Sequence, residues 1–264
     1  MSETIYSNII KEMVWSHSRV ASYHDCKYKW YLKYLYGVEE KEQFFASYGS
    51  LIHRLLEMRL KSGVKVPILA NMFLLEYNLL PIDGCPSEKI RTSYFKKGLD
   101  FLKSLSRKDY FPAMEIVGVE KKIDFEIDGF KFTGFIDLIG KTDDGYVILD
   151  HKSRDLKPRS NRKKPTKSDA ELDEYLRQLY LYATWVKDTY GEFPKKLMFN
   201  CFKEQIIIVE DFDYEKWKEA IAWYVGTIHS IISETDYYPS IEYFKCRNLC
   251  ECHDECDYYG METW

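Results

Sequence analysis

The chain of 264 residues is 45% apolar and 16% aromatic, which allows a substantial buried core and excludes a disordered protein. Its formal net charge of −4 excludes a global positive field, so any contact with nucleic acid must depend on local patches. The sequence contains no apolar run near the roughly 18 residues of a membrane span, and its start lacks the pattern of a signal peptide. We therefore expect one domain over residues 1–264, in the cytoplasm and without a membrane partner.

The N-terminal part is predicted to be mainly helical. Aromatic and basic residues recur at helical spacing over residues 15–36. Leucine and isoleucine side chains with a period near 3.6 residues predict an amphipathic helix that begins after Gly49, and His53 lies beside this apolar stripe. Residues 66–110 are predicted to form further helices.

The middle of the chain predicts three antiparallel strands. Residues 115–127 alternate between polar and apolar, and the tight turns Asp128-Gly129 and Asp144-Gly145 follow in a spacing typical of consecutive hairpins. The third strand covers residues 146–152. Because side chains alternate along a strand, Ile148, Asp150 and Lys152 should share one face, and Val147, Leu149 and His151 the other.

The segment after the third strand is basic. Residues 152–168 contain eight Lys or Arg against one acid, together with two prolines, and predict a mobile loop that is either simply solvated or in contact with phosphates. Residues 169–190 predict a helix on which Gln178 and Tyr182 share a face. Two more strands at 197–202 and 205–210 precede a helix at 214–233.

Two carboxylates are expected to meet at the second hairpin. Pairing of residues 130–140 with 146–152 brings Asp137 close to Asp150, and Lys152 points the same way as Asp150. Neighbouring carboxylates repel unless a cation lies between them, and oxygen ligands suit Mg²⁺ or Mn²⁺. The alternative is an ordinary Asp–Lys ion pair at a strand end.

Four of the seven cysteines, Cys246, Cys250, Cys252 and Cys256, lie within eleven residues. In a reducing compartment such crowding favours metal ligation over disulfides. The spacing alone leaves zinc, a disulfide pair and an iron–sulfur cluster open. Cys26 is far from this group, and its type alone suggests a small buried apolar residue.

Three motifs together resemble the PD-(D/E)xK nuclease superfamily, and most closely its RecB-like branch with the CRISPR-associated, AddB-type and exonuclease V nucleases. They are Gly134-Phe-Ile-Asp137, Asp150-His-Lys152 and Gln178-Leu-Tyr-Leu-Tyr182. The resemblance implies an α/β fold: a mixed central β-sheet flanked by helices, with a restriction-endonuclease-like core, a helical lobe and a C-terminal Cys-rich metal-bound staple. The implied parts are a helical portion at about 15–110, a catalytic sheet at 115–210, and a C-terminal helix with the cysteine cluster at 211–264.

The resemblance also implies the site residues. Asp137, Asp150, His53 and the main-chain carbonyl of His151 would hold one or two Mg or Mn ions, with Glu120 in an accessory role. Lys152 would orient the attacking water or help to deprotonate it. Gln178 and Tyr182 would contact DNA near the scissile phosphate.

The same resemblance implies a [4Fe-4S] cluster, with Cys26 as its first ligand. The family usually shows Cys-x2-Cys-x5-Cys near the C-terminus, whereas Cys246 and Cys250 are one residue further apart and Cys250 and Cys256 have the x5 spacing. The implied ligands are Cys26, Cys246, Cys250 and Cys256, with Cys252 as the alternate and zinc as the alternative metal.

The function that follows is that of a metal-dependent DNA nuclease, an exonuclease acting on single-stranded DNA or DNA ends, in recombination, repair or CRISPR adaptation. The sequence contains no helicase motif, so unwinding would need a helicase or a recombination or CRISPR partner. One alternative is a non-catalytic DNA-binding or assembly subunit, against which the intact Asp137, Asp150 and Lys152 argue. Another is a zinc-bound nucleic-acid-binding module.

Overall fold

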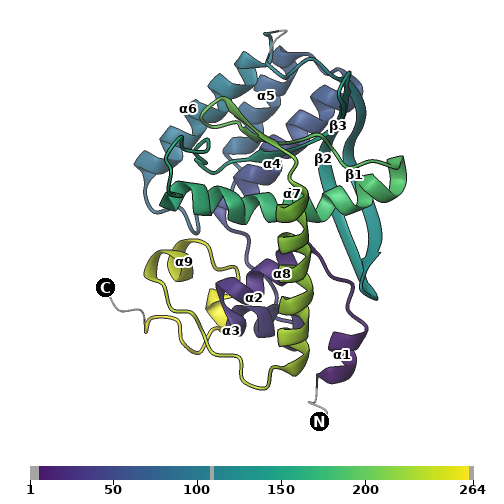
Figure 1. Ribbon diagram of the computed structural model, residues 1–264. Coiled ribbons are helices and arrows are strands. Elements are labelled where there is room, and N and C mark those ends of the chain that lie inside the picture. The colour runs from purple at the N-terminus through teal and green to yellow at the C-terminus, as the bar shows by residue number, and fades with distance from the viewer. Residues whose placement is uncertain (1–5, 108–109, 262–264) are drawn as a thin grey trace.

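A five-stranded mixed sheet lies at the centre of the molecule (Figure 1). The computed structural model describes residues 6–107 and 110–261. The strands follow the order β1-β2-β3-β4-β5, with β3 and β4 parallel and the other pairs antiparallel. Their bounds are β1 Glu115–Ile127, β2 Phe130–Thr142, β3 Gly145–Lys152, β4 Lys196–Cys201 and β5 Ile206–Asp211. The mixed sheet predicted from the sequence is therefore confirmed.

Turn chemistry sets the order of the strands. Asp128 and Gly129 both have positive φ, 48° and 81°, which is the backbone of a tight two-residue hairpin. Parallel strands need a long crossover, and α7 (Lys167–Tyr190) supplies it between β3 and β4. A capping box of Thr166 and Asp169 begins this helix, and Gly191 in the left-handed conformation ends it.

The remaining helices form three groups along the chain. The short α1 (Ser7–Lys11), α2 (His17–Asp25) and α3 (Lys27–Tyr31) continue into a π-helical turn, Leu32–Tyr36. The helical lobe comprises α4 (Phe44–Ser62), α5 (Val66–Tyr77) and α6 (Glu88–Ser104). The C-terminal part contains α8 (Tyr214–Ser233), α9 (Tyr243–Asn248) and one 3₁₀ turn, His253–Glu255.

The start of α4 differs from the prediction. The helix begins at Phe44, and Gly49 lies inside it. A Cβ at Gly49 would come 3.9 Å from the Ser153 hydroxyl, an ordinary van der Waals distance, so this position does not require glycine.

Helices cover both faces of the sheet. Ile148, Leu197 and Phe199 pack with the apolar residues of α7 and α8, whereas Val147, Leu149 and Met198 form a cluster that contacts Leu60 of α4. This is the alternation predicted for β3. It directs Asp150 and Lys152 toward α7 and the His151 ring toward the helical lobe, because side chains two residues apart share a face.

The two ends of the chain meet on one side of the molecule, where α2 and α3 lie beside α8 and the segment after α9 (Figure 1). The Tyr28 hydroxyl donates a hydrogen bond to Asp257 (2.6 Å), and Lys29 forms an ion pair with Glu251 (2.8 Å). No helix within the described ranges has the length and apolar character needed to cross a membrane.

Candidate active site

The carboxylate of Asp137 lies in a gap between β2 and β3. The two strands pair as far as Leu138 and Leu149, and Asp137 and Asp150 are the next positions along them. There the His151 N–H donates to Asp137 Oδ2 (2.6 Å), so a side-chain oxygen replaces the backbone acceptor of the ladder. Asp137 and Asp150 are 8% and 5% exposed, which makes both carboxylates sensitive to every nearby charge.

His53 of α4 contacts the oxygen atoms around this gap. Its Nε2 lies 2.8 Å from the His151 carbonyl oxygen, and its Nδ1 lies 3.4 Å from Asp137 Oδ2 and 3.8 Å from Glu120 Oε1. Burial lowers the pKa of His53, but the contacts with Asp137 and Glu120 outweigh it and raise the pKa to about 10. The protonated imidazole therefore supplies the positive charge that these oxygens require.

Glu120 reaches the site through an unusual backbone conformation. Its φ of 46° is in the left-handed region, which a β-strand residue with a side chain rarely adopts. The β1–β2 register places Val119 opposite Leu138 and Lys121 opposite Ile136, so Glu120 falls opposite Asp137. Glu120, Asp137 and Asp150 thus occupy one row across three adjacent strands.

Lys152 connects the acidic row to α7. Its ammonium lies 2.9 Å from Asp150 Oδ2 and donates to Gln178 Oε1 at 2.8 Å. Burial lowers the pKa of Lys152, but the Asp150 carboxylate outweighs it and the pKa is raised, so the amine stays protonated. Burial raises the pKa of Asp150, Lys152 lowers it and the Asp137 carboxylate raises it, and the net result is a pKa of about 6.

Tyr182 belongs to the same network. The Gln178 amide donates to the Tyr182 hydroxyl at 3.3 Å. The Tyr182 ring rests on Gly134, where an added Cβ would come 2.8 Å from the ring. This close approach requires glycine and fixes the distance between α7 and β2. Gln178 therefore contacts Lys152 directly, and Tyr182 joins the network through Gln178.

The donor atoms fit a divalent cation. One ligand atom each from His53, Glu120 and Asp137 lies within 4.8 Å of the others. Asp150 is outside this group of three, but its buried Oδ2 accepts no well-aligned hydrogen bond in the part of the chain that the structure describes. Carboxylates, a carbonyl and an imidazole are the donors expected for Mg²⁺ or Mn²⁺.

Comparison with known proteins agrees with this geometry. The model of the PD-(D/E)XK nuclease superfamily matches residues 14–257. The chain belongs to this superfamily. One similar solved structure is a protein from Eubacterium rectale proposed to be an exonuclease, with a TM-score of 0.57, 16% identity, and coverage of 97% of this chain and 92% of that one. The structure of SSO0001 has a TM-score of 0.30, 12% identity, and coverage of 97% and 98%. A search of curated proteins finds no match.

The basic loop of this PD-(D/E)XK protein uses part of its charge internally. Arg159 forms ion pairs with Asp173 and Glu210, each at 2.7 Å. Arg162 and Lys163 are exposed, so they are free to meet solvent or a ligand. Phosphate contact by this loop stays a prediction.

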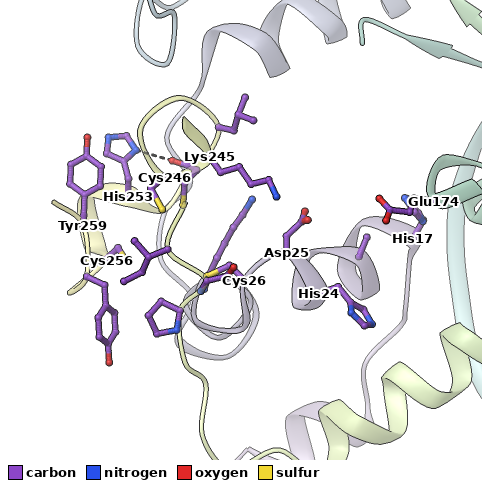
Figure 2. Close-up of a pocket in the computed structure, with 18 of the residues that line it drawn as sticks. His17, His24, Asp25, Cys26, Glu174, Lys245, Cys246, His253, Cys256 and Tyr259 are labelled. Atoms are coloured by element: carbon purple, nitrogen blue, oxygen red, sulfur yellow. Dashed lines mark hydrogen bonds between the residues drawn. The ribbon is translucent and has the colours of Figure 1, made fainter. Parts of the chain in front are cut away.

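The cysteines meet at a cavity of about 750 Å³ on the side of the molecule where the chain ends converge (Figure 2). The Cys26 side chain faces the C-terminal segment across this cavity, and Cys252 is only 1% exposed and does not line it. Within the described ranges, no three cysteine sulfurs lie within 4.8 Å of one another. The lining residues include Cys26, Cys246, Cys250 and Cys256.

One supporting residue of the site escaped sequence reasoning. Asn200 on β4 is fully buried; it contacts His151 Nδ1 at 2.9 Å and accepts a hydrogen bond from the Tyr110 hydroxyl at 2.8 Å. It holds the His151 ring and therefore the carbonyl that His53 contacts. The signal was an asparagine within an otherwise apolar strand, since a buried amide needs partners.

Proposed function

We propose that this protein is a Mg²⁺- or Mn²⁺-dependent deoxyribonuclease, an exonuclease that acts on single-stranded DNA or DNA ends. The observation that supports it most is the convergence of His53, Glu120 and Asp137, with Asp150 and Lys152 beside them. The exonuclease activity proposed for the Eubacterium rectale protein adds support to the finer assignment. The reaction fits recombination, repair or CRISPR adaptation, and it would need a helicase or another partner for unwinding.

In this proposal the acidic row holds the metal and α7 holds the DNA strand. His53, Asp137, Asp150 and the His151 carbonyl, with Glu120 as an accessory ligand, would coordinate a cation that lowers the pKa of bound water and neutralises phosphate charge. His53 would bind the cation through a ring nitrogen that carries no proton. Lys152 would orient the attacking water or help to deprotonate it, and its charge would stabilise the transition state. Gln178 fixes Lys152, and Tyr182 positions the strand.

We further propose that Cys26, Cys246, Cys250 and Cys256 bind a [4Fe-4S] cluster, as in the RecB-like, AddB-type and CRISPR-associated branch. All four line one cavity, and the alternate, Cys252, does not. Zinc, the alternative, would bring four sulfurs to about 3.8 Å from one another, given bonds of roughly 2.3 Å.

The test is cleavage of end-labelled single- and double-stranded DNA with Mn²⁺ by Asp150→Asn and Lys152→Ala variants. Both are expected to lose at least about 100-fold in rate, because each removes a charge that acts on the transition state. Binding to DNA should survive. Lys103→Ala, which changes an exposed cation on α6, is the control. Wild-type activity in both site variants would refute the assignment, and binding without any wild-type cleavage would favour the DNA-binding or assembly subunit.

A further inference from the structure

We propose that Arg177 binds a backbone phosphate of single-stranded DNA beside the catalytic site, in the part of the cavity that lies away from the cysteines. This inference rests on the proposed function and adds a strand-binding subsite to it. We call this part the Arg177 subsite. His17 and Glu174 lie at the end of the cavity opposite Cys246 and Cys256, with His24 between them (Figure 2). The Arg177 subsite is lined by His17, His24, Arg154, Tyr175, Arg177 and Trp223.

The Arg177 guanidinium is fixed in place but has no anionic partner. Its central carbon lies 4.8 Å from the centroid of the Trp223 ring, which also stacks on His24 at 4.7 Å with an interplanar angle of 21°. His24 is held in turn by Thr227 (Nε2 to Oγ1, 2.9 Å). Among the described residues, Arg177 forms no ion pair and no hydrogen bond through its side chain. A guanidinium held by an aromatic face with free N–H groups is well suited to bind a phosphate.

The other cations of the cavity are already neutralised. Arg154 pairs with Glu171 at 3.2 Å, Lys29 with Glu251 at 2.8 Å, and Lys245 with Glu242 at 2.9 Å. Two carboxylates, Asp25 and Glu174, also line the wall, and neither is within ion-pair distance of Arg177 among the described residues. The uncompensated positive charge is therefore concentrated at Arg177, and a phosphate is expected to bind there.

The Arg177 subsite adjoins the catalytic residues. Arg177 directly precedes Gln178, whose side chain accepts from Lys152. Tyr175, on the same helix, presents its ring 5.5 Å from Lys152 Nζ and 5.6 Å from the guanidinium carbon of Arg154. We infer that a strand held at Lys152 extends along α7 toward Arg177, where a further phosphate binds.

The size and surface of the cavity favour a single strand. Its volume of about 750 Å³, part of which faces the cysteines, is in the range of roughly 300–1,000 Å³ that encloses a small ligand and is too small for a duplex. Tyr175 lines the same cavity and offers an aromatic ring, whereas the Trp223 ring holds the guanidinium and stacks on His24. Cationic contacts combined with aromatic surfaces are the usual means of binding single-stranded nucleic acid without sequence preference.

The test is fluorescence anisotropy with a labelled oligo(dT) strand and a labelled blunt duplex, in the full chain carrying Asp150→Asn so that binding is read without cleavage. Arg177→Ala is expected to weaken single-strand binding about ten-fold and to reduce the slope of log affinity against log salt by about 0.7, the value for one phosphate contact. Arg177→Lys should recover only part of the loss. Duplex binding should change little.

Trp223→Leu tests whether the ring positions the guanidinium. Alone it should weaken single-strand binding, and in the Arg177→Ala protein it should have no further effect. Lys103→Ala is the matched control, and thermal melting verifies that each variant is folded. Equal single-strand binding by the Arg177→Ala and Lys103→Ala proteins would overturn the inference. If the two variants bind equally and the wild type still cleaves DNA, only the inference about Arg177 is wrong. If Arg177→Ala loses binding but the wild type does not cleave DNA, the proposed nuclease activity is wrong and the Arg177 subsite stands.

Discussion

Backbone strain at Glu120 indicates that its carboxylate position matters. A non-glycine residue with positive φ costs of order 1 kcal/mol or more, and such residues persist only where their surroundings hold them. At this site the conformation brings Glu120 Oε1 to 3.8 Å from the His53 ring. The proposed accessory ligand role gives this cost a physical reason.

We predict that Glu120→Gly melts at a higher temperature than Glu120→Ala. Both variants lack the carboxylate, but only glycine adopts φ near 46° without steric cost, so the difference reports the strain, about 1 kcal/mol or a few degrees. Both should lose Mn²⁺-dependent cleavage to the same extent. Calorimetry and the labelled-DNA assay measure the two effects. A higher melting temperature for the alanine variant would contradict the strain argument.

His17 should make the fold sensitive to acid. Burial, followed by the charges of Lys152 and Arg177, lowers its pKa from 6.5 to about 3. The unfolded chain therefore binds a proton that the folded one excludes, and the stabilising effect of the neutral ring is lost progressively as pH falls from about 6.5 toward 3. The expected slope is about 1.4 kcal/mol per pH unit.

A His17→Phe variant tests this pH dependence. It loses the contact with the Tyr224 hydroxyl (2.6 Å in the wild type), so it should be less stable at pH 7. Its free energy of unfolding should nevertheless fall less steeply between pH 6 and pH 4 than that of the wild type. Denaturant titrations over this range give both slopes. Parallel slopes would show that His17 titrates normally in the folded protein.

Local sequence patterns predicted that Asp137, Asp150 and Lys152 lie together, but they did not indicate Arg177 or Asn200. Strand alternation and hairpin turns were enough to place Asp137, Asp150 and Lys152 together, because these signals act over a few residues. Arg177 and Asn200 were missed, because their roles depend on the α2 and α8 side chains or on the Tyr110 hydroxyl, which lie far away in the sequence. Contacts of this range are visible only when the elements are assembled.

At the scale of elements, strands and long helices were predictable and their ends less so. The helix predicted at 214–233 has those bounds in the structure. The start of α4 was placed after Gly49 because glycine usually interrupts helices, whereas the helix runs through this residue from Phe44 to Ser62. The buried apolar side chains on both sides of Gly49, among them Tyr48 and Leu51, are what make this stretch helical despite the glycine.

We predict that Asp169 is important for the stability of α7 and for the path of the basic loop. Its carboxylate accepts hydrogen bonds from the Ser160 and Thr166 side chains and N–H groups, which lower its pKa. Asp169→Ala should lower the melting temperature and expose residues 153–166 to protease. Asp169→Asn, which keeps one acceptor, should fall between the wild type and the alanine variant. Asp173→Ala, on the same helix, is the comparison that removes only ion pairs.

At the scale of the whole molecule, the proposed cluster would join the two chain ends. Cys26 lies at the boundary of α2 and α3, and its proposed co-ligands lie more than two hundred residues later. Binding energy of a metal group that holds such distant segments contributes directly to folding. The helical lobe has an apolar cluster of its own, whereas Val20, Tyr23 and Trp30 of α2 and α3 belong to the same apolar cluster as the sheet.

We therefore predict that Cys26→Ser or Cys256→Ser removes iron and visible absorption from protein purified without air, and releases α2, α3 and the segment after α9 to protease. The helical lobe, which has an apolar cluster of its own, should stay folded. Cys85→Ser changes a thiol that does not line the cysteine cavity and should keep iron, colour and protection. Iron analysis, absorption spectra and timed proteolysis followed by mass spectrometry measure each outcome. Colourless wild-type protein with stoichiometric zinc would reject the iron–sulfur cluster but keep the closure, whereas wild-type protein without either metal, as resistant to protease as Cys26→Ser, would reject both.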